Sequence, residues 1–116
     1  LDQVYDEIWT LRAAQPTILR AYGVWGPWLS QWQQMGIDAE CMGGEEAADQ
    51  ARRESAETHG GIFVSMLDVF NGPEHDQDPV AKGWIADDGM HLSADGLVVL
   101  TDALAGAGFD ASEPPR

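Results

Sequence analysis

The chain has 116 residues, of which 44% are hydrophobic and 22% charged, a balance typical of one folded domain and not of a disordered or membrane-embedded chain. Twenty acidic residues against six basic ones give a formal net charge of -14. This charge argues against nucleic acid and anionic membrane surfaces as partners, because both are bound through clustered Lys and Arg side chains.

Cysteine usage and the first residues narrow the possibilities further. Cys41 is the only cysteine, so no intrachain disulfide can form, and it has no basic neighbour in sequence that would favour a reactive thiolate. No apolar run is long enough to span a bilayer, and the acidic residues 1–7 do not resemble a signal peptide. Because the chain begins at Leu1, we expect that a segment upstream has been removed or is not shown.

The first part of the chain alternates helical and extended patterns. In chain order, the sequence predicts an amphipathic helix at residues 1–14, a short buried strand at 17–22 and an aromatic loop at 23–44 that contains a short helix at 29–35. A charged helix at 45–58 and a strong apolar strand at 62–70 follow. Val4, Ile8 and Leu11 give the first helix its spacing, and Gly60 with Gly61 ends the charged helix. The aromatic loop is too long for a simple connection, which points to a functional role.

The last part of the chain predicts a loop that leads into a terminal helix. Asn71 and the following Gly-Pro pair end the apolar strand, and residues 74–79 form an acidic turn region. A helix follows at about residues 97–105, and residues 106–116 are predicted to be a flexible tail. Helices that alternate with strands are typical of an α/β domain with a parallel sheet.

The residues with the clearest chemistry are Asp88 and His91, in the sequence Asp-Asp-Gly-Met-His that starts at Asp87. A carboxylate three residues before a loop histidine can hold one ring nitrogen and leave the other facing a cleft, which is the arrangement that a general base needs. Alone, this pattern is common in caps and surface pairs. Its context is more specific, because it lies after a strand and a loop and before an apolar terminal helix.

A longer string of residues carries a family resemblance. It runs from Asp68-Val-Phe-Asn-Gly-Pro, through Asp78-Pro and Lys82-Gly, to Asp88-Gly-Met-His and Asp95-Gly. Nearly the whole chain resembles the C-terminal portion of the SGNH, or GDSL-type, serine hydrolases. The resemblance implies that residues 1–116 are part of a flavodoxin-like, three-layer α/β/α domain, with His91 and Asp88 as catalytic residues.

The same resemblance leaves the nucleophile unassigned. In the family, a Gly-Asp-Ser-type turn after the first strand carries the serine, and later blocks add a Gly and an Asn to the oxyanion hole. None of these blocks is recognisable here, and no Gly-x-Ser-x-Gly elbow occurs. The serines of the chain are better explained as structural residues, and Ser93 is predicted to cap the last helix.

Two further groups are candidates for a binding site. Trp25 and Trp28, together with Trp32, either line a substrate pocket or cover the core or a surface that the missing half would bury. Asn71 follows the apolar strand, so it is expected at the carboxyl edge of the sheet, where α/β sites form. A metal site formed by His75 with Asp76 and Asp78, with Asp88 and His91 as further ligands, is an alternative, but its spacing matches no structural zinc pattern, so no metal is assigned.

Two functions follow as expectations. The first is the C-terminal part of a serine esterase or related acyl hydrolase that acts on a small-molecule ester, needs no cofactor and takes its serine from an upstream segment. The second is a non-catalytic half that acts as an interaction module, paired in a homodimer or with a complementary N-terminal fragment, because an incomplete parallel sheet exposes an apolar edge. Family analogy suggests a secreted or periplasmic location.

Overall fold

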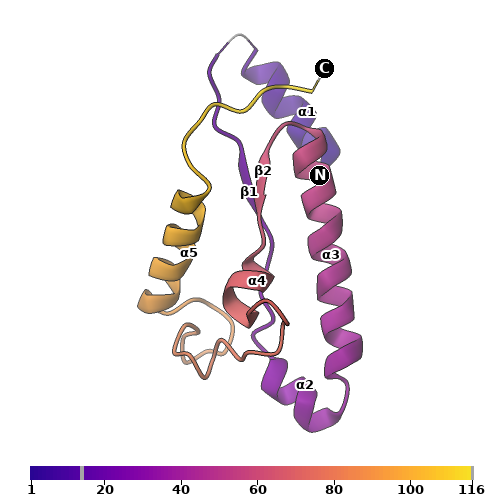
Figure 1. Cartoon of the computed structure of the whole chain (residues 1–116), viewed down its shortest axis with the longest axis vertical. Coiled ribbons are helices and arrows are strands. Elements are labelled where there is room, and N and C mark those ends of the chain that lie inside the picture. Colours follow the sequence, from indigo (N-terminus) through magenta and orange to yellow (C-terminus); the bar gives the residue numbers. More distant parts are fainter. Residues whose placement is uncertain (14, 116) are drawn as a thin grey trace.

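The structure is a computed structural model that describes residues 1–13 and 15–115 of the chain. The described residues form helices and strands in the order α1 (Asp2–Leu11), β1 (Arg20–Tyr22), α2 (Leu29–Met35), α3 (Asp38–Thr58), β2 (Ile62–Val64), α4 (Met66–Asn71) and α5 (Ala94–Gly106). Figure 1 shows β1 and β2 in the middle of an elongated molecule, with α3 on one side of them and α5 on the other.

The two strands pair in parallel, with Arg20 opposite Ile62 and Tyr22 opposite Val64. The connection between them contains α2 and α3, as parallel pairing requires a long crossover. The predicted mixed α/β class with parallel pairing is therefore confirmed in this coarse form. Among the described residues, no helix is both long and apolar enough to cross a membrane.

The apolar core lies mainly under α3. One buried cluster joins α1, the residue before β1, α3 and β2 through Tyr5, Leu19, Ala56 and Phe63. A second cluster joins α2, α3 and α4 through Leu29, Met42 and Leu67, with Trp32 packed against it. Both clusters include a residue of α3, which therefore contributes to the whole core.

The apolar run at 62–70 was predicted as one strand, and this prediction is wrong beyond Val64. Ser65 caps a helix instead: its hydroxyl accepts a hydrogen bond from the Asp68 backbone N–H at 3.2 Å, and α4 continues to Asn71. An unbroken apolar run has no period that separates a buried strand from a buried helix. The capping serine and the acidic Asp68 in the first turn favour the helix.

Other boundaries also differ from the predictions, and the first and last helices cover Asp2–Leu11 and Ala94–Gly106 in place of 1–14 and about 97–105. The charged helix begins at Asp38 and not at residue 45, and it includes the two glycines at 43 and 44. The first strand covers only Arg20–Tyr22 of the predicted 17–22. The predicted tail makes specific contacts, since Ser112 forms an antiparallel bridge with Thr17 and the Arg20 side chain donates hydrogen bonds to the carbonyl groups of Gly108 and Asp110.

Candidate functional site

The Asp88 and His91 loop is a small hairpin that precedes α5. Ile85 and Leu92 form an antiparallel bridge, and the Ala86 N–H donates to the His91 carbonyl oxygen at 2.8 Å. Gly89 closes the turn at a positive φ of 73°, a conformation that favours glycine. The hairpin therefore fixes the backbone of residues 86–91.

The hairpin is also fixed to the start of α5. The Ser93 hydroxyl accepts a hydrogen bond from the Gly96 N–H at 3.1 Å and donates one to the Gly83 carbonyl at 2.7 Å. A side chain at Gly96 would collide with the Trp84 carbonyl oxygen, only 2.1 Å from an added Cβ. The predicted cap at Ser93 is confirmed, and it explains why a serine and a glycine occupy these positions.

Asp88 holds the histidine ring through one nitrogen. Its Oδ2 lies 2.6 Å from Nδ1 of His91, and its Oδ1 accepts the N–H groups of Met90 and His91, each at 2.9 Å. Because an ionised carboxylate can only accept, Nδ1 carries the proton and Nε2 has the free lone pair. No described residue forms a hydrogen bond with Nε2, and the His91 side chain is 79% exposed.

The same contacts set the charge of the carboxylate. The hydrogen bond from His91, followed by those from the two backbone N–H groups, lowers the pKa of Asp88 from its ordinary value of 3.8 to about 2. Asp88 is therefore ionised throughout the neutral range. A permanently charged carboxylate on Nδ1 fixes the tautomer and stabilises the imidazolium that forms when Nε2 accepts a proton.

Aromatic side chains connect the hairpin to the rest of the fold. Trp84 packs edge-on against Phe70 at 5.5 Å between ring centroids, and Phe70 stacks on Trp25 at 5.0 Å. Lys82 donates to the Phe70 carbonyl at 2.9 Å and lies 4.5 Å from the Trp84 ring, and burial lowers the pKa of its ammonium group. The hairpin and the loop after β1 are thus packed on one buried phenylalanine.

Trp25 and Trp28 line a common pocket of about 250 Å³. The other residues that line it are Val24, Pro27, Glu45 and Met90. Met90 is the residue before His91, so the pocket borders the Asp88 and His91 loop. Met90 and Glu45 were not predicted as pocket residues. Met90 lies between Asp88 and His91 in the sequence, and this position was the one signal that could have identified it as a pocket residue. Trp32, in contrast, packs against the core.

Asn71 has a structural role and is not among the residues that line this pocket. It is fully buried, and its Oδ1 accepts the Gly26 N–H at 2.8 Å. Its Nδ2 donates to the carbonyl groups of Gly26 at 3.0 Å and Gln77 at 3.1 Å. Both amide hydrogens are used, so Asn71 has no donor left for a ligand. Its role is to fasten the loop before Trp28 to the end of α4.

The serine side chains have structural partners. Ser30 donates to Asp78, Ser55 donates to Asp2 at 2.5 Å, and Ser112 accepts the Leu19 N–H at 2.9 Å. Ser65 and Ser93 cap helices. Within the described residues, no serine hydroxyl is hydrogen-bonded to His91.

The acidic turn does not gather the side chains of the alternative metal site. His75 bonds through Nδ1 to Glu46 of α3 and through Nε2 to Asp68 of α4, each at 2.7 Å. Asp78 instead accepts the Val80 N–H at 2.9 Å as well as the Ser30 hydroxyl. Within residues 1–13 and 15–115, no group of three or more His, Cys, Asp or Glu side chains is arranged to hold a metal ion.

Comparison with protein-family models, with curated proteins and with solved structures finds no match to this chain.

Proposed function

We propose that this chain is the C-terminal portion of an SGNH-type serine ester hydrolase, in which His91 is the general base and Asp88 orients it. The observation that carries the proposal is the 2.6 Å contact between Asp88 and Nδ1 of His91, which leaves Nε2 without a partner among the described residues. The sequence resemblance supplies the reaction class. The parallel strand pair is compatible with the flavodoxin-like domain that the resemblance implies.

In this proposal the serine comes from a segment outside this chain. Its hydroxyl gives its proton to Nε2 of His91 as the oxygen attacks the ester carbonyl, and Asp88 stabilises the resulting imidazolium. The imidazolium then protonates the departing alcohol, which leaves an acyl-enzyme. Water, deprotonated by the same nitrogen, hydrolyses the acyl-enzyme and regenerates the serine. The reaction needs no cofactor.

The pocket beside the hairpin fits the acyl or aryl portion of such a substrate. Trp25, Trp28 and Met90 present apolar surface next to the residue that carries the base. Apolar pockets with a few polar groups at one end are typical of small-molecule sites. We therefore propose a small-molecule ester with an apolar group as the substrate class.

The experiment is an ester-hydrolysis assay on the full-length gene product with p-nitrophenyl esters and the His91→Ala variant. We expect kcat/KM to fall by at least about 10³-fold, as when a general base of this type is removed. His75→Gln is the matched control, because both nitrogens of His75 are already bonded to carboxylates, and it is expected to retain activity. Unimpaired turnover by His91→Ala would refute the assignment.

A further inference from the structure

The pocket that borders the hairpin has one charged residue in its lining, Glu45 of α3. The other residues that line it are apolar: Val24, Trp25, Pro27, Trp28 and Met90. Its volume of about 250 Å³ is below the roughly 300 Å³ at which pockets for drug-sized ligands begin. The pocket therefore has room for one small group, which would contact apolar side chains and a single carboxylate.

The carboxylate of Glu45 has no partner within the chain. Within residues 1–13 and 15–115, it forms no hydrogen bond or ion pair, whereas the neighbouring Glu46 is bonded to His75 at 2.7 Å. No Lys, Arg or His lines the pocket. The Glu45 side chain is half-buried, and an unpaired charge beside apolar side chains is unfavourable. The site therefore favours a ligand that brings a positive charge.

The two indole rings of the pocket are held in place by other aromatic residues. Phe70 stacks on Trp25 at 5.0 Å between ring centroids, and Trp32 packs edge-on against Trp28 at 6.3 Å. The Trp28 side chain still keeps 39% of its surface exposed, and Met90 keeps 52%. Rings that are already fixed lose little conformational entropy when a ligand binds, and Trp is the aromatic residue that attracts cations most strongly.

Elsewhere in the fold, aromatic rings already have cations from the chain itself. The Lys82 ammonium lies 4.5 Å from the centroid of the Trp84 ring, and the Arg53 guanidinium lies 5.1 Å from that of Phe63. Among the described residues, no side-chain cation lies over a ring of the pocket. The two indoles of the pocket are thus available to a cation from outside the chain.

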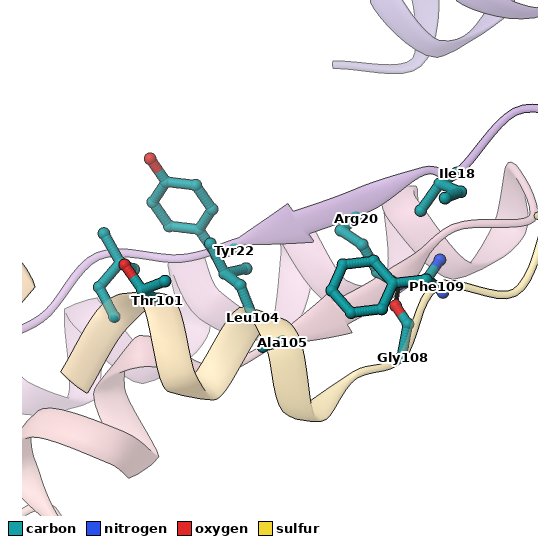
Figure 2. A pocket seen from close by; sticks show the side chains of 9 residues that line it. Ile18, Arg20, Tyr22, Thr101, Leu104, Ala105, Gly108 and Phe109 are labelled. Atoms are coloured by element: carbon teal, nitrogen blue, oxygen red, sulfur yellow. Dashed lines mark hydrogen bonds between the residues drawn. The ribbon is translucent and has the colours of Figure 1, made fainter. Parts of the chain in front are cut away.

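A larger groove between β1 and α5 provides a contrast. It has a volume of about 330 Å³, and Figure 2 shows its side chains, which come from β1 and the residues before it on one side and from α5 and the turn after it on the other. Arg20 is the one charged residue among the described residues that line this groove. A cationic ligand would meet a guanidinium there and not a carboxylate, so the groove serves as an internal control.

We propose that the pocket lined by Trp25, Trp28, Glu45 and Met90 binds a quaternary ammonium group, such as the trimethylammonium group of choline. The methyl groups of such an ion pack on the rings, and its charge interacts with the indole faces and the carboxylate. A primary ammonium is less suited, because it is strongly hydrated and the apolar lining does not replace its hydrogen bonds to water. As a statement about the substrate, the inference rests on the proposed hydrolase function: the ester then carries a cationic end, as choline esters do.

The experiment compares choline with 3,3-dimethylbutan-1-ol, which has the same shape but a carbon atom in place of the nitrogen and no charge. Each is titrated into the 116-residue chain at constant ionic strength, and binding is followed by the indole N–H signals of Trp25 and Trp28 and the methyl signal of Met90 in NMR spectra. We expect saturable binding of choline, at least about tenfold tighter than that of the neutral alcohol. The methyl signals of Leu104, in the groove between β1 and α5, should not move with choline.

Variants separate the pocket from the overall charge of the chain. Glu45→Gln keeps the shape of the side chain and removes its charge, so it should weaken choline binding by about fivefold and leave the neutral alcohol unchanged. Glu54→Gln is the matched control, because it changes the net charge equally on the same helix, about 13 Å further along, and it should leave choline binding unchanged. Trp28→Leu keeps an apolar side chain without an aromatic face, and it should weaken choline binding more than that of the neutral alcohol.

Any of three results would overturn the proposal. The first is equal affinity for choline and the neutral alcohol, which would indicate a purely apolar pocket. The second is an equal loss of choline binding in Glu45→Gln and Glu54→Gln, which would indicate attraction by the net charge of -14. The third is the absence of saturable choline binding up to about 10 mM.

The hydrolase function fails or holds in a different measurement, made on the full-length gene product with a choline ester and the 3,3-dimethylbutyl ester of the same acid. Hydrolysis that depends on His91 but does not favour the choline ester would retain the hydrolase and reject the cationic substrate. Choline binding that depends on Glu45, without hydrolysis of either ester, would retain the binding site and reject the hydrolase.

Discussion

His91 and His75 both contact carboxylates at short distance, yet they are suited to different tasks. His91 bonds to Asp88 through Nδ1 and keeps Nε2 free, on a side chain that is 79% exposed. His75 bonds through one nitrogen to Glu46 and through the other to Asp68, on a side chain that is 17% exposed. The comparison shows that a histidine beside a carboxylate can act as a general base only when its second ring nitrogen is free to accept a proton.

The elements that hold each ring explain the difference. His91 lies in a hairpin whose partner Asp88 is three residues away in sequence, so the pair forms locally. His75 instead joins α3 to α4, and its backbone has a positive φ of 54°, which is uncommon outside glycine. Because both nitrogens contact carboxylates, these hydrogen bonds raise the pKa of His75 and favour its imidazolium form, which fastens a loop.

The largest effect is expected when the carboxylate beside His91 is neutralised. Under the proposed hydrolase function, Asp88→Asn in the full-length gene product should lower kcat by about 10²–10⁴-fold, because an amide can favour the tautomer with the proton on Nε2 and cannot balance the imidazolium charge. Asp68→Asn, the same change beside His75, should leave kcat within about twofold, because His75 does no chemistry in this account. Equal losses in the two variants would remove the distinction between the two histidines.

A smaller effect is expected on the carboxylate itself. Removal of the ring by His91→Ala should raise the pKa of Asp88 from about 2 toward its ordinary value of 3.8, since the histidine is the largest cause of the lowered pKa. The hydrogen bonds from the Met90 and residue 91 N–H groups remain and should keep the pKa below 3.8. The measurement is the carboxyl ¹³C chemical shift between pH 1 and 6, with His75→Gln as the control that leaves Asp88 unchanged. An unaltered titration in His91→Ala would contradict the geometry.

The smallest effect concerns stability near neutral pH. Partial burial opposes the charge on His75, but its hydrogen bonds to Asp68 and Glu46 raise its pKa above the ordinary value of 6.5. A raised pKa stabilises the fold fully below pH 6.5, and this contribution is lost as the pH rises through the higher, folded-state pKa. His75→Gln should therefore cost about 0.5–1 kcal/mol at pH 6, reduced by solvent screening, and almost nothing at pH 9. Urea unfolding at both pH values measures this difference, and a cost that grows with pH would refute the imidazolium.

The sequence was sufficient for features that depend on local residues. The cap at Ser93 follows from the capping preference of serine, and the structure has both this cap and the short helix predicted at 29–35. Asp88 and His91 lie three residues apart, so the motif alone predicts their contact. The predicted pair of Trp25 and Trp28 also lines one pocket, although only the fold brings Met90 to it.

The sequence was insufficient where distant residues decide the outcome. The run at 62–70 has no usable period, and burial against α3 and the second core cluster converts its second half into α4. Asn71 was predicted near the site because it follows that run in the sequence. In the structure its side-chain amide is fully used in hydrogen bonds to Gly26 and Gln77. The contacts of Ser112 with Leu19, 93 residues away, are beyond any local pattern.

The most direct test of the central claim is the tautomer of His91, measured in the 116-residue chain by ¹⁵N NMR of its imidazole at a pH where the ring is neutral. The account predicts that Nδ1 carries the proton, held by Asp88, and that Nε2 is unprotonated, with the preference weakened in Asp88→Asn. A ring that carries its proton mainly on Nε2 in the wild-type chain would have no free base and would contradict the proposed role of His91.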